Sequence, residues 1–103
     1  MKIKEKITVG SIESADIMIT LEPTSKLGIE IILESNFIKQ YGDEIKQIII
    51  DELKTNNIEQ VKVIVVDQGA IPAVIKARII TAINRLNNEK FFNFIEGENN
   101  EKS

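Results

Sequence analysis

Apolar and polar residues alternate along three stretches near the start of the chain, and this period of two predicts β-strands. The three stretches are Ile7–Ile12, Asp16–Pro23 and Gly28–Ser35. A fourth stretch, Val61–Asp67, is β-branched at almost every position, which predicts a strand at the centre of a sheet. Between and after these stretches the apolar residues recur every three or four positions instead, which is typical of helices.

Two helices follow from this longer spacing. The apolar face of the first consists of Tyr41, Ile45, Ile48, Ile49 and Leu53, and that of the second of Ile71, Ile75, Ile79, Ala82, Ile83 and Leu86. Pro72 suits the first turn of a helix. The pair Gly42-Asp43 leaves two alternatives for the first helix. Either Asp43 caps its start, or the helix begins after Ser35 or Asn36 and carries a glycine that costs about 1 kcal/mol.

The predicted order of elements is therefore βββαβα. The first three strands are close enough in sequence for antiparallel hairpins, and a strand–helix–strand connection normally pairs its strands in parallel. Two helices on one face of a four-stranded mixed sheet would bury all the apolar stripes, so we predict an α+β fold, a two-layer α/β sandwich. We expect a single domain over residues 1–90. Residues 91–103 form a tail, with the aromatic residues of "KFFNF" just after the last helix and disorder expected over "EGENNEKS".

Composition narrows the function chiefly through what is missing. The chain has 103 residues and a net charge of -3, which argues against nucleic-acid binding. No apolar run approaches the roughly 20 residues that span a bilayer, and no signal peptide is recognisable, so we expect a cytoplasmic protein. Cysteine and histidine are absent, which removes a thiol nucleophile, the usual general base and the usual metal ligands. We expect no metal site, and a reactive group, if one is used, should come with a cofactor or partner.

Ser14 is the main candidate for a functional residue. It lies in "GSIESADIMI", at the junction of the first two predicted strands. Serine and aspartate are favoured in turns, so an ordinary turn is one interpretation. The other is a modification site, because a small hydroxyl on a connection is accessible to an enzyme that supplies the catalytic base. The neighbouring Glu13 and Asp16 could act as an acid–base pair, although two solvated carboxylates are the more common arrangement.

Two further features are candidates for binding. The turn Asp67–Ala70 joins the central strand to the last helix, where free backbone N–H groups could hold a phosphate. An ordinary strand-to-helix turn is the alternative that we favour. Arg78 and Arg85 lie on one side of the last helix and could contact an acidic partner, but a solvated face is the expected arrangement.

Taken together, "GSIESADIMI", "YGDEIKQIIIDEL", "VKVIVVDQGAI" and "IKARIITAI" resemble the acyl carrier proteins of citrate lyase, the gamma chains of that enzyme. The resemblance extends from about Met1 to Leu86. Its most specific part is Gly-Ser/Thr-hydrophobic-Glu-Ser-x-Asp, matched by Gly10–Asp16, and Ala77-Arg78 belongs to it as well. Many family members have glycine at the position of Ala15.

This resemblance implies that the chain is a phosphoprotein in which Ser14 carries 2′-(5″-phosphoribosyl)-3′-dephospho-CoA through a phosphodiester. The thiol of this prosthetic group would hold the acetyl or citryl group. The resemblance also implies a non-catalytic subunit in citrate fermentation, loaded by a prosthetic-group transferase. The partners would be an alpha chain, the acyl transferase, and a beta chain, the citryl lyase. Together they would convert citrate to acetate and oxaloacetate. The alternatives are the carrier subunit of malonate decarboxylase and a non-covalent binding or assembly module, with a stand-alone enzyme as a more distant possibility.

Overall fold

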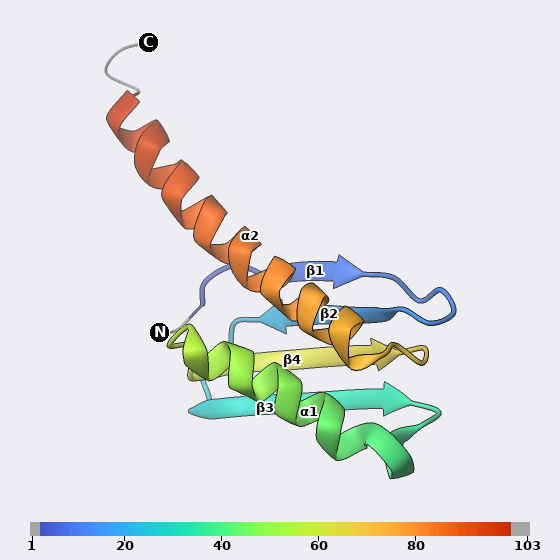
Figure 1. Ribbon diagram of the computed structural model, residues 1–103. Coiled ribbons are helices and arrows are strands. Elements are labelled where there is room, and N and C mark those ends of the chain that lie inside the picture. Colours follow the sequence, from blue (N-terminus) through green and yellow to red (C-terminus); the bar gives the residue numbers. More distant parts are fainter. Residues whose placement is uncertain (1–2, 100–103) are drawn as a thin grey trace.

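The computed structural model describes residues 3–99, with side chains described as far as residue 87. It has the predicted order of four strands and two helices (Figure 1). The elements are β1 (Ile7–Gly10), β2 (Ile17–Glu22), β3 (Gly28–Ser35), α1 (Ile38–Thr55), β4 (Gln60–Asp67) and α2 (Pro72–Asn99). Within the described residues, neither helix is long and apolar enough to cross a bilayer.

The four strands form one mixed sheet in the order β1-β2-β4-β3. β4 lies between β2, to which it is antiparallel, and β3, to which it is parallel. This confirms the prediction that the β-branched strand is central. The hairpin between β1 and β2 is also confirmed, with Val9 opposite Ile19. The expected hairpin between β2 and β3 is wrong, because β4 is inserted between them and takes the backbone hydrogen bonds of both.

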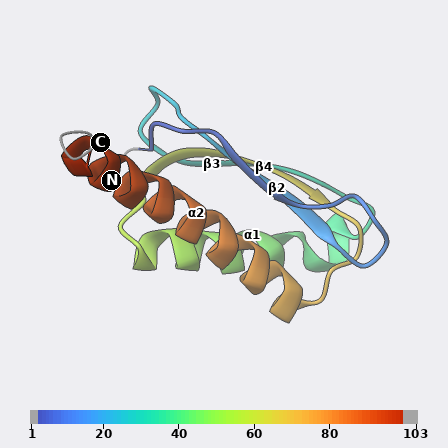
Figure 2. The ribbon, with the colours of Figure 1, turned by 90° about the horizontal axis from the view of Figure 1, so that it is seen from above.

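Both helices cover the same face of the sheet, as predicted (Figure 2). α2 packs against β1 and β2, α1 packs against β3, and the helices also contact each other. Alternate residues of the central strands point into the layer between sheet and helices, where Ile19, Val63 and Val65 are almost completely buried. Burying this apolar surface is the main driving force for the fold.

The start of α1 decides between the two alternatives left by the sequence. The helix runs through Gly42, and Phe37 is its N-cap, without a capping hydrogen bond from a side chain. Gly42 is buried, and a Cβ there would lie 3.0 Å from Cγ1 of Ile38. The glycine thus allows close packing at the first turn and does not end the helix.

Two residues assigned to apolar helix faces are in fact exposed. Tyr41 is 54% exposed, and Ile71 is 63% exposed because it precedes the first residue of α2. Both correct the prediction, and both lie at the same end of the molecule, where the two helices begin.

The last helix is longer than predicted. α2 continues to Asn99, so Phe91, Phe92 and Phe94 lie within it and not after it, and residues 96–99 of the expected disordered end are helical. Residues 100–103 lie outside the described residues. Figure 1 shows the reason for the error, since the second half of α2 extends beyond the sheet. The apolar stripe ends where the sheet ends, while the helix goes on. The boundary at residue 90 between domain and tail stays a prediction.

Candidate functional site

Ser14 lies in the connection between β1 and β2, and Figure 1 shows this connection beyond one end of the strands. Its side chain is exposed, in agreement with the prediction. Its hydroxyl forms no hydrogen bond with any of the residues whose side chains the structure describes. A group attached to this oxygen would therefore replace water and not a protein contact.

The connection around Ser14 is nevertheless firmly held, chiefly by the carboxylate of Asp16. Arg78 of α2 donates two hydrogen bonds to it, from Nε to Oδ1 at 3.0 Å and from Nη2 to Oδ2 at 2.7 Å. Ser11 Oγ donates to Oδ2 at 2.7 Å, and the N–H of Ile17 donates to Oδ1 at 2.7 Å. A carboxylate with four donors, two of them from a guanidinium group, is a strong and directional anchor.

These donors also fix the charge of Asp16. The hydrogen bonds from Arg78 hold the pKa of its carboxyl group well below the usual range, and those from Ser11 and Ile17 lower it further. The expectation of a solvated Asp16 and a solvated Arg78 is wrong, because they bind each other. It also follows that Asp16 is unsuited to act as a general base. Arg85 likewise has a partner within the fold, since its Nη1 donates to the carbonyl oxygen of Thr8 at 3.2 Å.

The Ser14 connection is also joined to the turn between β4 and α2. The N–H of Ala15 donates to the carbonyl oxygen of Gln68 at 2.8 Å, and the N–H of Gln68 donates to that of Asp16 at 2.9 Å. Ala15 adopts a left-handed backbone conformation, with φ at 65°, to make this contact. The two segments thus continue the pairing of β2 and β4 past the ends of both strands.

The turn from Asp67 to Ala70 is held by its own buried carboxylate. Asp67 accepts hydrogen bonds from Ser35 Oγ at 2.8 Å and from the N–H of Ala70 at 3.0 Å. The N–H of Ala70 is therefore occupied, and the carboxylate beside the turn would repel a phosphate. This favours the ordinary strand-to-helix turn over a phosphate site.

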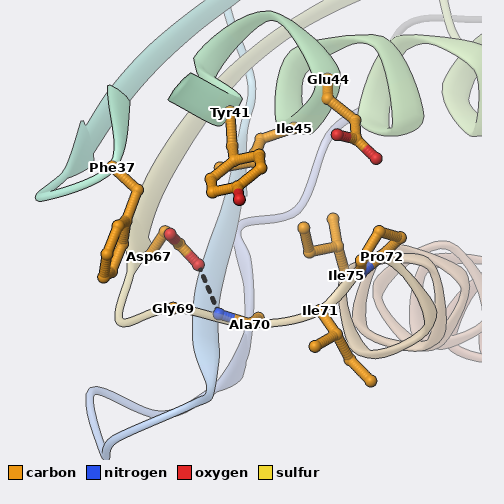
Figure 3. A pocket seen from close by; sticks show the side chains of 10 residues that line it. All are labelled: Phe37, Tyr41, Glu44, Ile45, Asp67, Gly69, Ala70, Ile71, Pro72 and Ile75. Carbon is orange, nitrogen blue, oxygen red and sulfur yellow. Dashed lines mark hydrogen bonds between the residues drawn. The ribbon is translucent and has the colours of Figure 1, made fainter. Parts of the chain in front are cut away.

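A pocket of about 390 Å³ opens next to this turn, between the starts of α1 and α2 (Figure 3). The residues that line it are Phe37, Tyr41, Glu44, Ile45, Asp67, Gly69, Ala70, Ile71, Pro72 and Ile75. Most of its wall is apolar. This pocket is not predictable from the apolar pattern, because that pattern places Tyr41 and Ile71 on buried helix faces and gives Phe37 no role.

The ion pair of Asp16 and Arg78 was also missed. Both residues belong to the segments on which the resemblance rests, which was a usable signal, but 62 positions separate them and only the folded chain brings them together. The structure thus connects the "GSIESADIMI" segment physically with the "IKARIITAI" segment.

Comparison with known proteins shows which family the sequence is similar to. A family model described as malonate decarboxylase delta subunit (MdcD), an acyl carrier family, matches residues 4–86. Citrate lyase acyl carrier protein of Streptococcus mutans is 44% identical over 85 residues, covering 82% of this chain and 83% of that protein. The protein of the same name from Lactiplantibacillus plantarum is 49% identical over 85 residues, covering 82% of this chain and 88% of the relative.

The fold is also found in a solved structure. A chain in the crystal structure of a Pseudomonas malonate decarboxylase hetero-tetramer in complex with malonate matches with a TM-score of 0.63. The match covers 84% of this chain and 88% of that one, at 20% sequence identity, so it bears on the fold alone. Fold and site together define a two-layer α/β domain with an exposed serine on a braced connection. By sequence, the chain belongs to the family of citrate lyase acyl carrier proteins.

Proposed function

We propose that this chain is the acyl carrier subunit of a cytoplasmic citrate lyase, and that Ser14 Oγ carries 2′-(5″-phosphoribosyl)-3′-dephospho-CoA through a phosphodiester. The observation that carries the proposal is the exposed hydroxyl of Ser14 on a connection braced by Asp16 and Arg78, in a member of this family. When attached, the group supplies a thiol that holds the acyl group, which the chain cannot do itself because it has no cysteine.

The residues around Ser14 suit such an attachment. Modification breaks no hydrogen bond of the described residues, so the folded state loses nothing when the oxygen becomes part of a phosphodiester. Arg78 neutralises Asp16, which leaves Glu13 as the nearby acid without a side-chain partner in the described region. Repulsion between the new phosphodiester and the connection is thereby reduced.

The bracing explains how a small chain can serve more than one partner. Asp16, Ser11 and Arg78 fix the connection on the domain, so the attachment point stays in place while the flexible arm moves. In this proposal the alpha chain, an acyl transferase, and the beta chain, a citryl lyase, bring the catalytic residues. This chain contributes none. A prosthetic-group transferase must recognise the connection around Ser14 as its substrate.

The first test is the intact mass of the chain purified from a host that is cleaving citrate. Tryptic cleavage after Lys6 and Lys26 yields one peptide that contains Ser11, Ser14 and Ser25. We expect the added mass of the prosthetic group on this peptide, and fragmentation should assign it to Ser14. Ser14→Ala should abolish the modification and citrate cleavage by the reconstituted complex. Ser25→Ala, at another exposed serine, should change neither.

The second candidate is the carrier subunit of a malonate decarboxylase. The description of the family model and the fold of the Pseudomonas chain favour it. Against it stands the identity of 38–49% to citrate lyase acyl carrier proteins, compared with 20% to the Pseudomonas chain. Malonate decarboxylation by the complex isolated with this chain, without citrate cleavage, would establish the second candidate and refute the first.

A non-covalent assembly module is the remaining alternative, with Ser14 as a turn residue only. It predicts that a complex containing Ser14→Ala cleaves citrate at the normal rate. A stand-alone enzyme would require citrate cleavage by the isolated chain, without partners.

A further inference from the structure

The pocket between the starts of α1 and α2 has the features of a ligand site. Its volume of about 390 Å³ falls within the range of about 300–1,000 Å³ that is typical of small-molecule sites. Ile45, Ala70 and Ile75 form apolar wall, and three large side chains stand at the rim with much of their surface exposed. These are Phe37 (41% exposed), Tyr41 (54%) and Ile71 (63%).

Exposed apolar side chains are informative when they gather at one place. Within residues 3–87, eight large hydrophobic residues are exposed, and these three line the same pocket. Figure 3 shows Phe37, Tyr41 and Glu44 extending from the start of α1 toward the turn at Gly69 and the start of α2. The ring of Phe37 lies close to Gly69, where a Cβ would be 3.3 Å from Phe37 Cε2. The absence of a side chain at Gly69 thus leaves room for this ring.

The pocket is adjacent to the attachment point. Ala15, which follows Ser14, donates its N–H to the carbonyl oxygen of Gln68, and Gln68 is bonded to Gly69 in the pocket wall. The bracing of the connection therefore also fixes the distance between Ser14 and the pocket. A group joined to Ser14 therefore starts beside the turn that forms one wall of this pocket.

The chemistry of the pocket selects one part of that group. Two aromatic rings offer stacking surfaces for a flat base. Glu44 forms no hydrogen bond or ion pair with the described residues, so its carboxylate is available to accept from an exocyclic amino group. The other carboxylate of the lining, Asp67, is already satisfied by Ser35 and Ala70. Two acidic side chains without a basic one disfavour a diphosphate or a citryl group.

We propose that this pocket binds the adenine base of the prosthetic group attached at Ser14, with stacking against Phe37 and Tyr41. The inference rests on the proposed function. In that group a phosphate and one pentose link Ser14 to the adenosine, and the diphosphate and the thiol arm come after it. Holding the base leaves the arm free to reach a partner, and it moves the effective origin of the arm from Ser14 to the mouth of the pocket.

The chain provides its own probe for this contact. Tyr41 is its only tyrosine, and it has no tryptophan. We expect the fluorescence of Tyr41 to be quenched in the modified protein relative to the unmodified protein, because a stacked base quenches the ring. Ile71→Glu, which replaces an apolar side chain at the rim with a charged and strongly hydrated one, should release the base and restore the emission in the modified protein. The matched control is Leu27→Glu, at a side chain that is 91% exposed and lies at the opposite end of the strands, and it should not restore the emission.

Phe37→Ala tests how much one stacking contact contributes to binding of the base. Loss of one aromatic stacking partner should shift the equilibrium between bound and free base about 5- to 150-fold toward the free form. The reaction rate of the thiol with Ellman's reagent shows which end of the group is bound. We expect the rate of free coenzyme A. Strong protection of the thiol would mean that the arm occupies the pocket, and it would overturn the assignment to adenine.

The outcomes separate the inference from the proposed function. Mass spectrometry first establishes whether Ser14 is modified. An unmodified chain from a citrate-cleaving host refutes the proposed function and the inference together. A modified chain whose Tyr41 emission equals that of the unmodified chain, or is insensitive to Ile71→Glu, refutes the inference alone and leaves the carrier role intact.

Discussion

The two connections that flank β2 differ in how they are held. Residues 11–16, between β1 and β2, are braced by the carboxylate of Asp16 and by two backbone hydrogen bonds to Gln68. Residues 23–27, between β2 and β3, have far fewer contacts in the described region. The N–H of Lys26 donates to Thr24 Oγ1 at 3.2 Å, and Gln60 Nε2 donates to the carbonyl oxygen of Thr24 at 2.7 Å.

This difference does not follow from composition, because both connections contain serine and a charged residue, and each is flanked on one side by a glycine at positive φ. The connection that crosses from β2 to β3 only has to pass the start of β4. The connection that carries Ser14 is anchored to a helix and to a second turn. A segment of six residues that receives so many contacts is expected where the position of one side chain matters.

The largest expected effect comes from the glycines at the two connections. Gly10 has φ at 84°, and a Cβ there would overlap the carbonyl oxygen of Ile17. Gly28 has φ at 93° but no atom within 4 Å of a Cβ. We expect Gly10→Ala to lower the free energy of unfolding by roughly 2–4 kcal/mol, from strain and displaced backbone. Gly28→Ala should lower it by about 1 kcal/mol, from strain alone. Urea denaturation of both variants tests the order, and equal losses would show that the connection around Ser14 yields easily.

A smaller effect is expected from Asp16→Asn. The variant keeps the shape of the side chain but removes the charge that Arg78 binds. We expect its melting temperature at neutral pH to fall by roughly 5 °C. Amide hydrogen exchange at Ala15 and Gln68 should accelerate, because both lie in the segment that Asp16 braces. The control is Glu13→Gln, at an exposed acid whose carboxylate forms no hydrogen bond or ion pair with the described residues, and it should leave both measurements unchanged.

The same carboxylate predicts how stability depends on pH. Folding lowers the pKa of Asp16 below the ordinary value of about 3.9, so the folded state binds fewer protons than the unfolded state. The contribution of Asp16 is therefore complete above that value and is lost as the pH falls below about 4. We expect the difference in melting temperature between the wild type and Asp16→Asn to be constant near neutral pH and to shrink in acid. A difference that persisted in acid would mean that the ion pair between Asp16 and Arg78 contributes little to stability.

The strands were predictable because their alternation is local. The residues of Asp16–Pro23 and Gly28–Ser35 show it in the sequence alone, and the β-branched run Val61–Asp67 is an equally local signal, so the order of elements followed. The position of β4 between β2 and β3 was not predictable, since the order of strands in a sheet depends on contacts between segments that are distant in sequence. Gly42 was open to two interpretations, because a glycine weakens a helix in solution but permits close packing when a neighbouring side chain lies 3.0 Å from the space of its Cβ.

At the site, the sequence predicted the position of Ser14 and its exposure, because turn residues between two strands are a local signal. It did not predict the pairing of Asp16 with Arg78 or the pocket beside it. The pairing joins the connection after β1 to α2, and the pocket lies between the ends of β3 and β4 and the starts of the two helices. Only the folded chain brings these segments together at one end of the molecule. A charged residue is expected to be solvated when its ion-pair partner is distant in sequence and cannot be identified.

The smallest effect, and the only one expected to be favourable, is that of Ala15→Gly. Ala15 has φ at 65°, a conformation that costs a residue with a side chain about 1–2 kcal/mol and costs glycine nothing. Glycine loses more backbone entropy on folding, by about 0.5–1 kcal/mol, so the two terms nearly cancel. We expect the variant to be more stable by roughly 0.5 kcal/mol, as determined by urea denaturation. A clear loss of stability would show that the methyl group of Ala15 contributes to the brace, and that the connection around Ser14 is stiffened by more than its hydrogen bonds to Gln68.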